Sequence, residues 1–464
     1  MGLISRRSYV KSALYHVLIV VLLCLDCCIG TSSNTRQLMV NRIAGEARGK
    51  IADTPERVSP KRPVGSSLVD GNDPFRAVWN LPNHCGDEFG IELPLAEYGI
   101  EFNSNHNRTG NVISLFYHRA LGLYPHYNIR DGKPVAVNKG LPQLGNITRH
   151  LEKAAADVLA AIPDPDFSGA GVLDWEFWRP QWEQNFDALA IYRNKSLDHV
   201  RASLPYIDDA TVEMLAQLEW TQAAKLYMES TLMLVKKLRP KAMWGYYRYP
   251  YCYDGHSPNM TCTETGMITN NNIMWLFNIS TALYPSIYLR PRFSDQRDYV
   301  KNHLKEAFRL RERSSDPKGP IFSYARFNYS KTGYYYSLED LNNTILLSAE
   351  MGTNGVVFWG DNNDDRTMQT CKGLQDYIRN ALGPVVAMSR KGAATCSARV
   401  CSGNGRCVGN ILTCGKDPAG VDGGRYWTVG DKFPEEGVKM DVCSCRCFRG
   451  WTGKDCSIPE TQQT

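Results

Sequence analysis

Leu-Asp-Trp-Glu-Phe-Trp-Arg, at residues 173–179, places two acidic residues two positions apart in an otherwise largely apolar run. Its alternation predicts a β-strand, and successive side chains on a strand point to opposite faces. Val172, Asp174 and Glu176 therefore share one face, and the large apolar residues between them share the other. An apolar outer face is typical of a parallel strand covered by helices, and an inner face that turns acidic at its carboxyl end is typical of the mouth of a barrel.

Short β-rich runs alternate with longer helical patterns from Phe75 to about Ala387, which indicates repeated βα units. The expected strands number seven, one short of the usual eight: 75–79, 112–117, 169–176, 242–247, 285–289, 321–325 and 355–359. The clearest helix begins at Asp208 or Asp209 and ends before Pro240, and a second covers residues 146–162. A chain of 464 residues has room for this barrel and one smaller module.

The N-terminal region has the anatomy of a signal peptide over residues 1–30, because basic residues precede a short apolar run and small residues follow it. A retained signal anchor is the alternative. Residues 31–72 are polar and without periodicity, so we expect a disordered leader or pro-segment, with Lys61-Arg62 as a candidate cleavage point or a plain linker. A net charge of +5 is far from a nucleic-acid-binding signature and mildly favours an anionic substrate.

Cysteines and glycosylation sequons both indicate an oxidising compartment. Outside the predicted signal peptide the chain has twelve cysteines, an even number that is consistent with six disulfides. Asn-x-Ser/Thr sequons occur at Asn107, Asn146, Asn194, Asn259, Asn278, Asn328 and Asn342. We therefore expect a secreted glycoprotein without a further membrane span.

The last segment, residues 391–464, changes character, because eight cysteines lie among glycine and polar residues. The runs Cys-Ser-Gly-Asn-Gly-Arg-Cys and Cys-Phe-Arg-Gly-Trp-Thr-Gly-Lys-Asp-Cys resemble an epidermal growth factor-like module. Zinc is the competing interpretation, but predicted secretion and the lack of nearby histidines favour disulfides, so no metal is expected.

Paired carboxylates at a barrel rim are suited to acid catalysis. Two neighbouring carboxyl groups do not both ionise readily, so one keeps its proton to higher pH and can protonate the departing oxygen of a glycoside. A solvated pair without function is the ordinary alternative. Aromatic and hydroxyl side chains at the ends of other expected strands favour a sugar site, because aromatic faces stack on sugar rings.

Several motifs in order along the chain resemble the hyaluronidases of glycoside hydrolase family 56. They are Val-Trp-Asn-Leu-Pro at 78–82, Gly-Leu-Pro-Gln-Leu-Gly-Asn at 140–146, Asp-Trp-Glu-Phe-Trp-Arg-Pro at 174–180, Trp-Gly-Tyr-Tyr at 244–247 and Ala-Leu-Tyr-Pro-Ser-Ile-Tyr-Leu at 282–289. The similarity runs from about Phe75 to the end and includes the cysteine module.

The resemblance implies an α/β fold, a distorted (β/α)7 TIM-like barrel over residues 73–390, followed by the small disulfide-rich module. It implies hydrolysis of the β-1,4 bond between N-acetylglucosamine and glucuronic acid in hyaluronan, with retention and without a cofactor. Glu176 would be the proton donor, Asp174 its tuning neighbour, and the substrate's own acetamido oxygen the nucleophile. Tyr247 would bind the acetamido group, and Tyr288, Tyr324 and Trp359 would contact the sugar. Tyr246, on the opposite face, would be structural.

The resemblance also implies disulfide pairings. In the barrel these are Cys85 with Cys371 and Cys252 with Cys262. In the module they are Cys396 with Cys407, Cys401 with Cys445, and Cys447 with Cys456, which leaves Cys414 and Cys443 to pair with each other.

Some questions stay open at this point. Arg248 follows Tyr247 where the family varies, and it is either a contact for a substrate carboxylate or a solvated residue of the rim. Chondroitin is an alternative substrate, and a non-catalytic hyaluronan-binding glycoprotein is an alternative function. A family 18 chitinase is excluded, because its motif needs aspartates where Gly169 and Val172 stand. We expect a secreted monomer, for example a venom spreading factor, rather than a lysosomal protein.

Overall fold

The computed structural model describes residues 33–52, 73–252, 262–290, 295–329, 332–361, 365–414 and 443–460. The predicted signal peptide, the Lys61-Arg62 pair and the Asn259 sequon lie outside these ranges. Among the described residues, no helix has both the length and the apolar character that a bilayer crossing requires.

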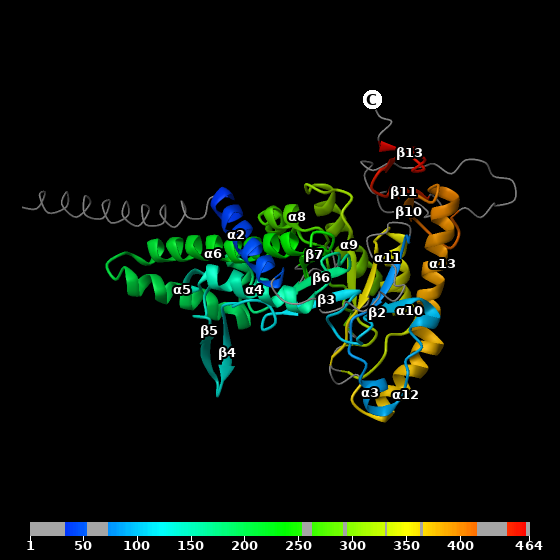
Figure 1. Ribbon diagram of the computed structural model, residues 1–464, viewed down its shortest axis with the longest axis horizontal. Coiled ribbons are helices and arrows are strands. Elements are labelled where there is room, and N and C mark those ends of the chain that lie inside the picture. Colours follow the sequence, from blue (N-terminus) through cyan, green and yellow to red (C-terminus); the bar gives the residue numbers. More distant parts are fainter. Residues whose placement is uncertain are drawn as a thin grey trace, which may run out of the picture.

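Parallel strands form the centre of the molecule (Figure 1). The strands are β1 Arg76–Trp79, β2 Ile100–Phe102, β3 Ile113–Tyr117, β6 Ala170–Asp174, β7 Met243–Tyr246, β8 Phe322–Ala325 and β9 Gly355–Phe358. They pair in the orders β2-β1-β9-β8 and β3-β6-β7. Strand β2 is an addition to the strands expected from the sequence.

The expected strand at 285–289 is absent from the structure. Residues 283–286 instead join β7 to β8 through isolated parallel bridges, Tyr247 with Tyr284, Leu283 with Ile321 and Ser286 with Tyr324. Pro285 has no N–H group to donate to a strand ladder, which explains the interruption. The segment nevertheless takes the position of a strand and connects the two sheets on this side.

The other junction, between β2 and β3, is bridged by one side chain. The Asn103 Nδ2 atom donates to the Ile113 carbonyl at 2.8 Å, and its Oδ1 accepts from the Ile113 N–H at 2.9 Å. The amide thereby imitates the pairing of a neighbouring strand. The result is a distorted barrel that is completed by bridges rather than by a continuous ladder.

Helices surround the strands. They are α2 Ser33–Ala52, α3 His84–Phe89, α4 Ile147–Ala161, α5 Ala190–Ser203, α6 Asp209–Leu238, α7 Glu264–Asn271, α8 Met274–Ile279, α9 Gln296–Glu312, α10 Leu338–Leu341, α11 Leu347–Glu350, α12 Met368–Tyr377 and α13 Gly383–Val400. The two helices expected from the sequence are confirmed as α6 and α4, whose N-caps are Asp208 and Asn146. A hairpin of β4 His126–Arg130 and β5 Lys133–Val137 projects from this layer (Figure 1).

The alternation read in residues 172–177 is confirmed by the packing. Val172 belongs to a small cluster that fills the barrel interior, together with Val78, Leu115 and Val357 from other strands. Leu173 and Trp175 belong to the larger cluster between strands and helices. The outward face is therefore apolar because helices cover it.

The expectation that residues 31–72 are disordered is wrong for the part that the structure describes. Residues 33–52 form α2, which packs on α4 and α6. Val40, Ile43 and Ala44 lie on one helical face and are at most 2 % exposed. An ion pair of 2.8 Å between Arg36 and Glu229 adds to the contact. The helix is hard to recognise in the sequence, because its few apolar residues lie among many polar ones.

The cysteine module follows the last helix without a linker, since α13 continues through the expected domain boundary at residue 390. It contains the strand pairs β10 Gly405–Val408 with β11 Ser444–Cys447, and β12 Trp451–Thr452 with β13 Ile458–Pro459. The six disulfides are Cys85–Cys371, Cys252–Cys262, Cys396–Cys407, Cys401–Cys445, Cys414–Cys443 and Cys447–Cys456. These pairs coincide with those that the family resemblance implies.

One of the expected glycosylation sites does not suit the fold. Asn328 is 3 % exposed, and its Oδ1 accepts hydrogen bonds from the Arg326 guanidinium at 2.8 and 3.1 Å. A glycan has no room at a buried amide, so this sequon is corrected to a structural asparagine. Asn107, Asn146, Asn194 and Asn278 are exposed, and Asn342 is half-buried.

Candidate active site

Asp174 is the last residue of β6 and lies among strands at the carboxyl end of the barrel. It is 9 % exposed and pairs in register with Tyr117, the last residue of β3. Burial raises the pKa of Asp174 well above its ordinary value, and the charge of Glu176 raises it further, while Arg248 and Arg179 partly offset both effects. The carboxyl group of Asp174 therefore holds a proton to an unusually high pH.

Glu176 does not lie on the strand, because β6 ends two residues earlier. The prediction of a strand through residue 176 is wrong at this end, yet the side chain still reaches the same site. It is a hydrogen-bond partner of Asp174, and its Oε2 atom lies 2.8 Å from Arg248 Nη1. Its side chain is 44 % exposed, so one carboxyl group of the pair is buried and the other faces solvent.

Arg248 follows β7 in a backbone conformation that is unusual for a large side chain, with φ at +74°. Its N–H donates to the Tyr284 carbonyl at 2.8 Å, which holds the backbone there. Its Nη2 donates to Tyr251 Oη at 2.9 Å. The strained backbone thus aims a guanidinium group at Glu176, an arrangement that is typical of functional sites.

Arg179 supports the other side of the loop that carries Glu176. Its Nη1 donates to the carbonyl oxygens of Glu176 at 2.9 Å and Trp178 at 3.3 Å. Its guanidinium also lies over the Tyr251 ring at 5.7 Å. These bonds fix the backbone of Glu176 where no strand ladder does.

The structure brings the four predicted aromatic residues together beside the carboxyl pair. Tyr247 donates to Ser286 Oγ at 3.4 Å, and its ring meets Tyr324 edge-on at a centroid distance of 5.0 Å. Tyr288 stacks with Trp359 at 6.1 Å. Burial raises the pKa of Tyr247, so its hydroxyl stays protonated and can donate a hydrogen bond.

Tyr324 differs from the other three, because it is only 1 % exposed. It lies inside the barrel with Tyr284, at a centroid distance of 6.1 Å. Tyr247, Tyr288 and Trp359 are half-buried and therefore keep surface for a ligand. Tyr246 lies on the opposite face, as predicted, and donates to the Met228 carbonyl at 3.1 Å.

Two further residues of the site belong to none of the motifs in the sequence. Tyr117 accepts a hydrogen bond from Trp359 Nε1 at 2.9 Å, and its position opposite Asp174 at a strand end was a signal that could have identified it. Arg326 lies over the Trp359 ring at 5.2 Å and pairs with Asp361 at 2.9 Å. It follows β8 directly, which is where a barrel places functional groups.

The arrangement can deliver a proton to an oxygen leaving group on a substrate that rests against aromatic rings. A buried carboxyl group stores the proton, an exposed one can reach a substrate, and tyrosine hydroxyls can orient polar substituents. Planar guanidinium groups beside the pair suit a substrate that carries carboxylates.

Comparison with known proteins agrees with this chemistry. A family model described as hyaluronidase matches residues 65–460. Hyaluronidase-1 of Rattus norvegicus is 37 % identical over 404 residues, which cover 83 % of this chain and 89 % of that protein. A hyaluronidase of Crotalus adamanteus is 36 % identical over 353 residues, with 73 % and 77 % covered.

A solved structure is also similar. The crystal structure of bee venom hyaluronidase in complex with a hyaluronic acid tetramer matches with a TM-score of 0.64 at 34 % sequence identity. The match covers 68 % of this chain and 98 % of the bee chain.

Proposed function

Because the chain belongs to the hyaluronidase family and is a glycosidase, we propose that it is a secreted enzyme that hydrolyses hyaluronan at the β-1,4 bond between N-acetylglucosamine and glucuronic acid, with retention of configuration. The observation that carries the proposal is the carboxyl pair at the rim, in which Asp174 is buried with a raised pKa and Glu176 is exposed. In a solvated pair without function, both carboxyl groups would be exposed to solvent.

The proposed reaction proceeds in two steps. The acetamido carbonyl oxygen of the substrate attacks C1, while the proton on Glu176 passes to the glycosidic oxygen and the bond from C1 to that oxygen breaks. In the second step a water molecule attacks C1, the bond from C1 to the acetamido oxygen breaks, and Glu176 takes a proton from that water. Two displacements at the same carbon restore the original β configuration.

Asp174 and Tyr247 hold the acetamido group during this reaction. The Asp174 carboxyl group interacts with that of Glu176 and can share its proton, so the pair carries one proton between two positions. Tyr247 donates from its protonated hydroxyl. Tyr288 and Trp359 form the aromatic contact with the sugar, while buried Tyr324 acts through Tyr247 as a positioning residue.

Arg248 selects for substrates that carry a carboxylate. In the free protein its guanidinium contacts the same Glu176 side chain that must face the glycosidic oxygen. A glucuronate carboxylate offers the guanidinium an equivalent partner and so releases Glu176. Neutral polymers lack this group and leave the ion pair in place.

Glu176→Gln in the full chain tests the proposal. We expect the variant to bind hyaluronan but to release reducing ends about 10²–10⁴ times more slowly than the wild type. A wild type that binds the polymer and releases no reducing ends would instead support a non-catalytic hyaluronan-binding glycoprotein. Parallel digestion of hyaluronan and desulfated chondroitin identifies the preferred polymer, since the two differ at one hexosamine hydroxyl.

A further inference from the structure

A second concave site lies at the opposite end of the barrel. A cavity of about 450 Å³ opens between the amino ends of β8 and β9 and the cysteine module. Its volume is within the range of pockets that hold small ligands. In Figure 1 the module strands β10, β11 and β13 lie at one end of the barrel, whereas α3 and α12, which follow the carboxyl ends of β1 and β9, lie at the other.

Positive charge dominates the lining of this cavity. Two carboxylates line it, and each has a cationic partner: Glu312 lies 2.8 Å from Arg446, and Glu460 pairs with Lys318. The remaining cations of the lining are Arg311, Arg406 and Lys454. Five cations against two carboxylates leave a surplus of three positive charges.

Arg311 is the strongest sign of a ligand. It is 1 % exposed, and its Nη1 donates to the Ser280 carbonyl at 3.1 Å. Its Nε and Nη2 atoms are buried and donate to no residue in the described ranges. Burial lowers the pKa of Arg311 to about 10 although Asp316 is nearby. A buried guanidinium with unused donors is costly, and an anion in the cavity would satisfy it.

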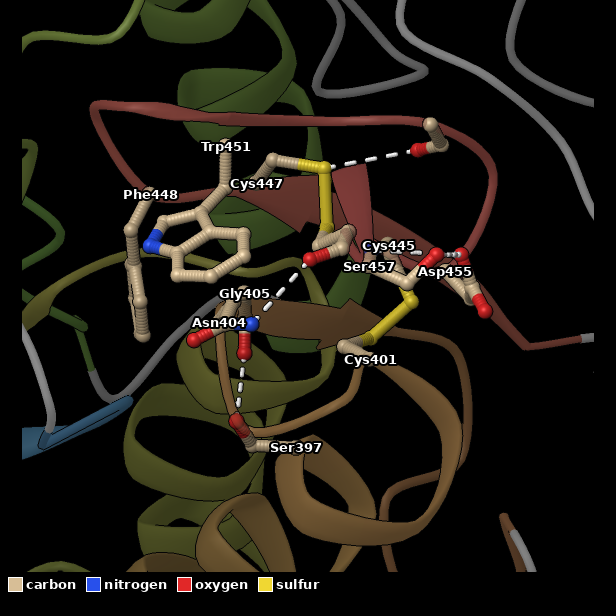
Figure 2. Close-up of a disulfide and its surroundings, with 12 residues drawn as sticks. Ser397, Cys401, Asn404, Gly405, Cys445, Cys447, Phe448, Trp451, Asp455 and Ser457 are labelled. Carbon is tan, nitrogen blue, oxygen red and sulfur yellow. Dashed lines mark hydrogen bonds between the residues drawn. A yellow bond between two sulfur atoms is a disulfide. The ribbon is translucent and has the colours of Figure 1, made fainter. Parts of the chain in front are cut away.

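Arg406 and Trp451 complete the recognition surface. Burial lowers the pKa of Arg406 to about 10, and its guanidinium lies over the Phe448 ring at 4.6 Å. Figure 2 shows the Trp451 indole beside the Phe448 side chain. The Trp451 carbonyl accepts from Lys318 Nζ at 2.6 Å, which ties this residue to the barrel. A half-exposed indole next to cations suits a sugar ring that carries an anionic group.

We propose that this cavity binds one acidic sugar unit, bearing a carboxylate or sulfate, of an anionic polysaccharide. Arg311 and Arg406 hold the oxyanion and Trp451 contacts the sugar. The inference rests on the proposed function in that the polymer held here is the one cut at the rim. A second attachment point raises the effective concentration of the polymer at the active site.

Binding stoichiometry tests the proposal. The parent protein is the full chain with Glu176→Gln, and calorimetric titration with a hyaluronan tetrasaccharide is expected to give two sites per chain. Arg406→Gln with Lys454→Gln is expected to leave one site. Arg311 is left unchanged in this variant, because its replacement would also remove the hydrogen bond to the Ser280 carbonyl and disturb folding. Lys241→Gln, an exposed cation paired with Asp166, is the matched control and keeps two sites.

Inorganic sulfate tests whether the cavity binds an acidic sugar unit or only a free oxyanion. We expect sulfate to compete for the second site only, and to weaken tetrasaccharide binding there by about tenfold at ten times its own dissociation constant. A stoichiometry of one in the parent, or sulfate binding without a second saccharide site, overturns the proposal. Failure of the proposed function is detected separately, as a wild type that releases no reducing ends from hyaluronan.

Discussion

At the carboxyl ends of the strands, Glu176 stands partly open to solvent and Arg248 is held at a positive φ. At the amino ends, Arg446 pairs with Glu312 while its guanidinium lies 3.9 Å from the centre of the Phe308 ring, and disulfides fix the neighbouring module. The same residue type is strained at one end and packed at the other. Strain and unequal burial mark the rim as the place of chemistry, whereas the amino end combines structural contacts with a basic cavity.

The largest expected effect concerns the carboxyl pair. Asp174→Asn and Glu176→Gln are each expected to lower kcat on hyaluronan by about 10²–10⁴-fold, and the double variant by little more than the worse single one. In the proposed mechanism the two groups share a proton and therefore act as a unit. The measurement is release of reducing ends, with exposed Glu213→Gln as the control. Effects that multiply in the double variant would contradict a shared proton.

Two neighbouring tyrosines sharpen the contrast between the faces of β7. Tyr247→Phe is expected to lower kcat/KM about 10–100-fold, because it removes the hydroxyl that is proposed to bind the substrate amide. Tyr246→Phe removes the bond to the Met228 carbonyl and is expected to lower the free energy of unfolding by about 1–3 kcal/mol, with kcat/KM unchanged. Steady-state kinetics and chemical denaturation measure both. A loss of activity in Tyr246→Phe and a loss of stability alone in Tyr247→Phe would contradict these roles.

Strain at Arg248 is a third test. Arg248→Gly is expected to raise KM for hyaluronan about tenfold, through loss of the proposed carboxylate contact, and to have a higher Tm than Arg248→Ala, because glycine adopts a positive φ without steric strain. Arg248→Ala is the matched control, since it removes the charge and keeps most of the strain. An unchanged KM in both variants would make Arg248 a solvated residue of the rim.

Stability as a function of pH tests the burial of Asp174. A carboxyl group whose pKa is raised on folding binds its proton more tightly in the folded state, so its contribution to stability is present at low pH and is lost as pH rises through the folded pKa. Asp174→Asn removes this dependence. The Tm of the variant is therefore expected to rise relative to that of the wild type as pH rises above about 4. The corresponding difference in the free energy of unfolding is about 1.4 kcal/mol for each tenfold difference in proton affinity between the folded and unfolded states. A constant Tm difference across pH would contradict the raised pKa.

The smallest effect belongs to the module end. Ser397→Ala removes the hydrogen bond of 2.6 Å from α13 to the Gly405 carbonyl, which Figure 2 shows. We expect the free energy of unfolding to fall by about 1 kcal/mol and kcat to stay unchanged. Ser203→Ala, an exposed serine that bonds within its own helix, is the control and should change stability by a few tenths of a kcal/mol. A fall in kcat for Ser397→Ala would indicate that the two ends are coupled.

Regular patterns of sequence could be predicted well. The alternation around Val172 gave the inner and outer faces of β6, and the capped helices from Asp208 and Asn146 were found because caps are local signals. Helix α2 was missed, because its apolar stripe of Val40, Ile43 and Ala44 has meaning only once α4 and α6 cover it. Irregular pairing at Pro285 was also missed, since it depends on both neighbouring strands.

The site was predictable where one motif carried it and not where tertiary contacts did. Asp174, Glu176 and Tyr247 belong to short motifs, whereas Tyr117 and Arg326 belong to none, and their contacts with Trp359 are made only in the folded chain. The basic cavity joins residues of α9 to residues of the module that lie far away along the chain, so no local pattern could indicate it.

The role of Glu176 as proton donor can be tested by a crystal structure of the Glu176→Gln protein with a hyaluronan hexasaccharide. We expect a sugar bound at the carboxyl end of the barrel, with the residue 176 side chain within about 2.6–3.2 Å of a glycosidic oxygen and the acetamido group beside Tyr247 and Asp174. A hexasaccharide that binds in full occupancy with every glycosidic oxygen out of reach of residue 176 would contradict it.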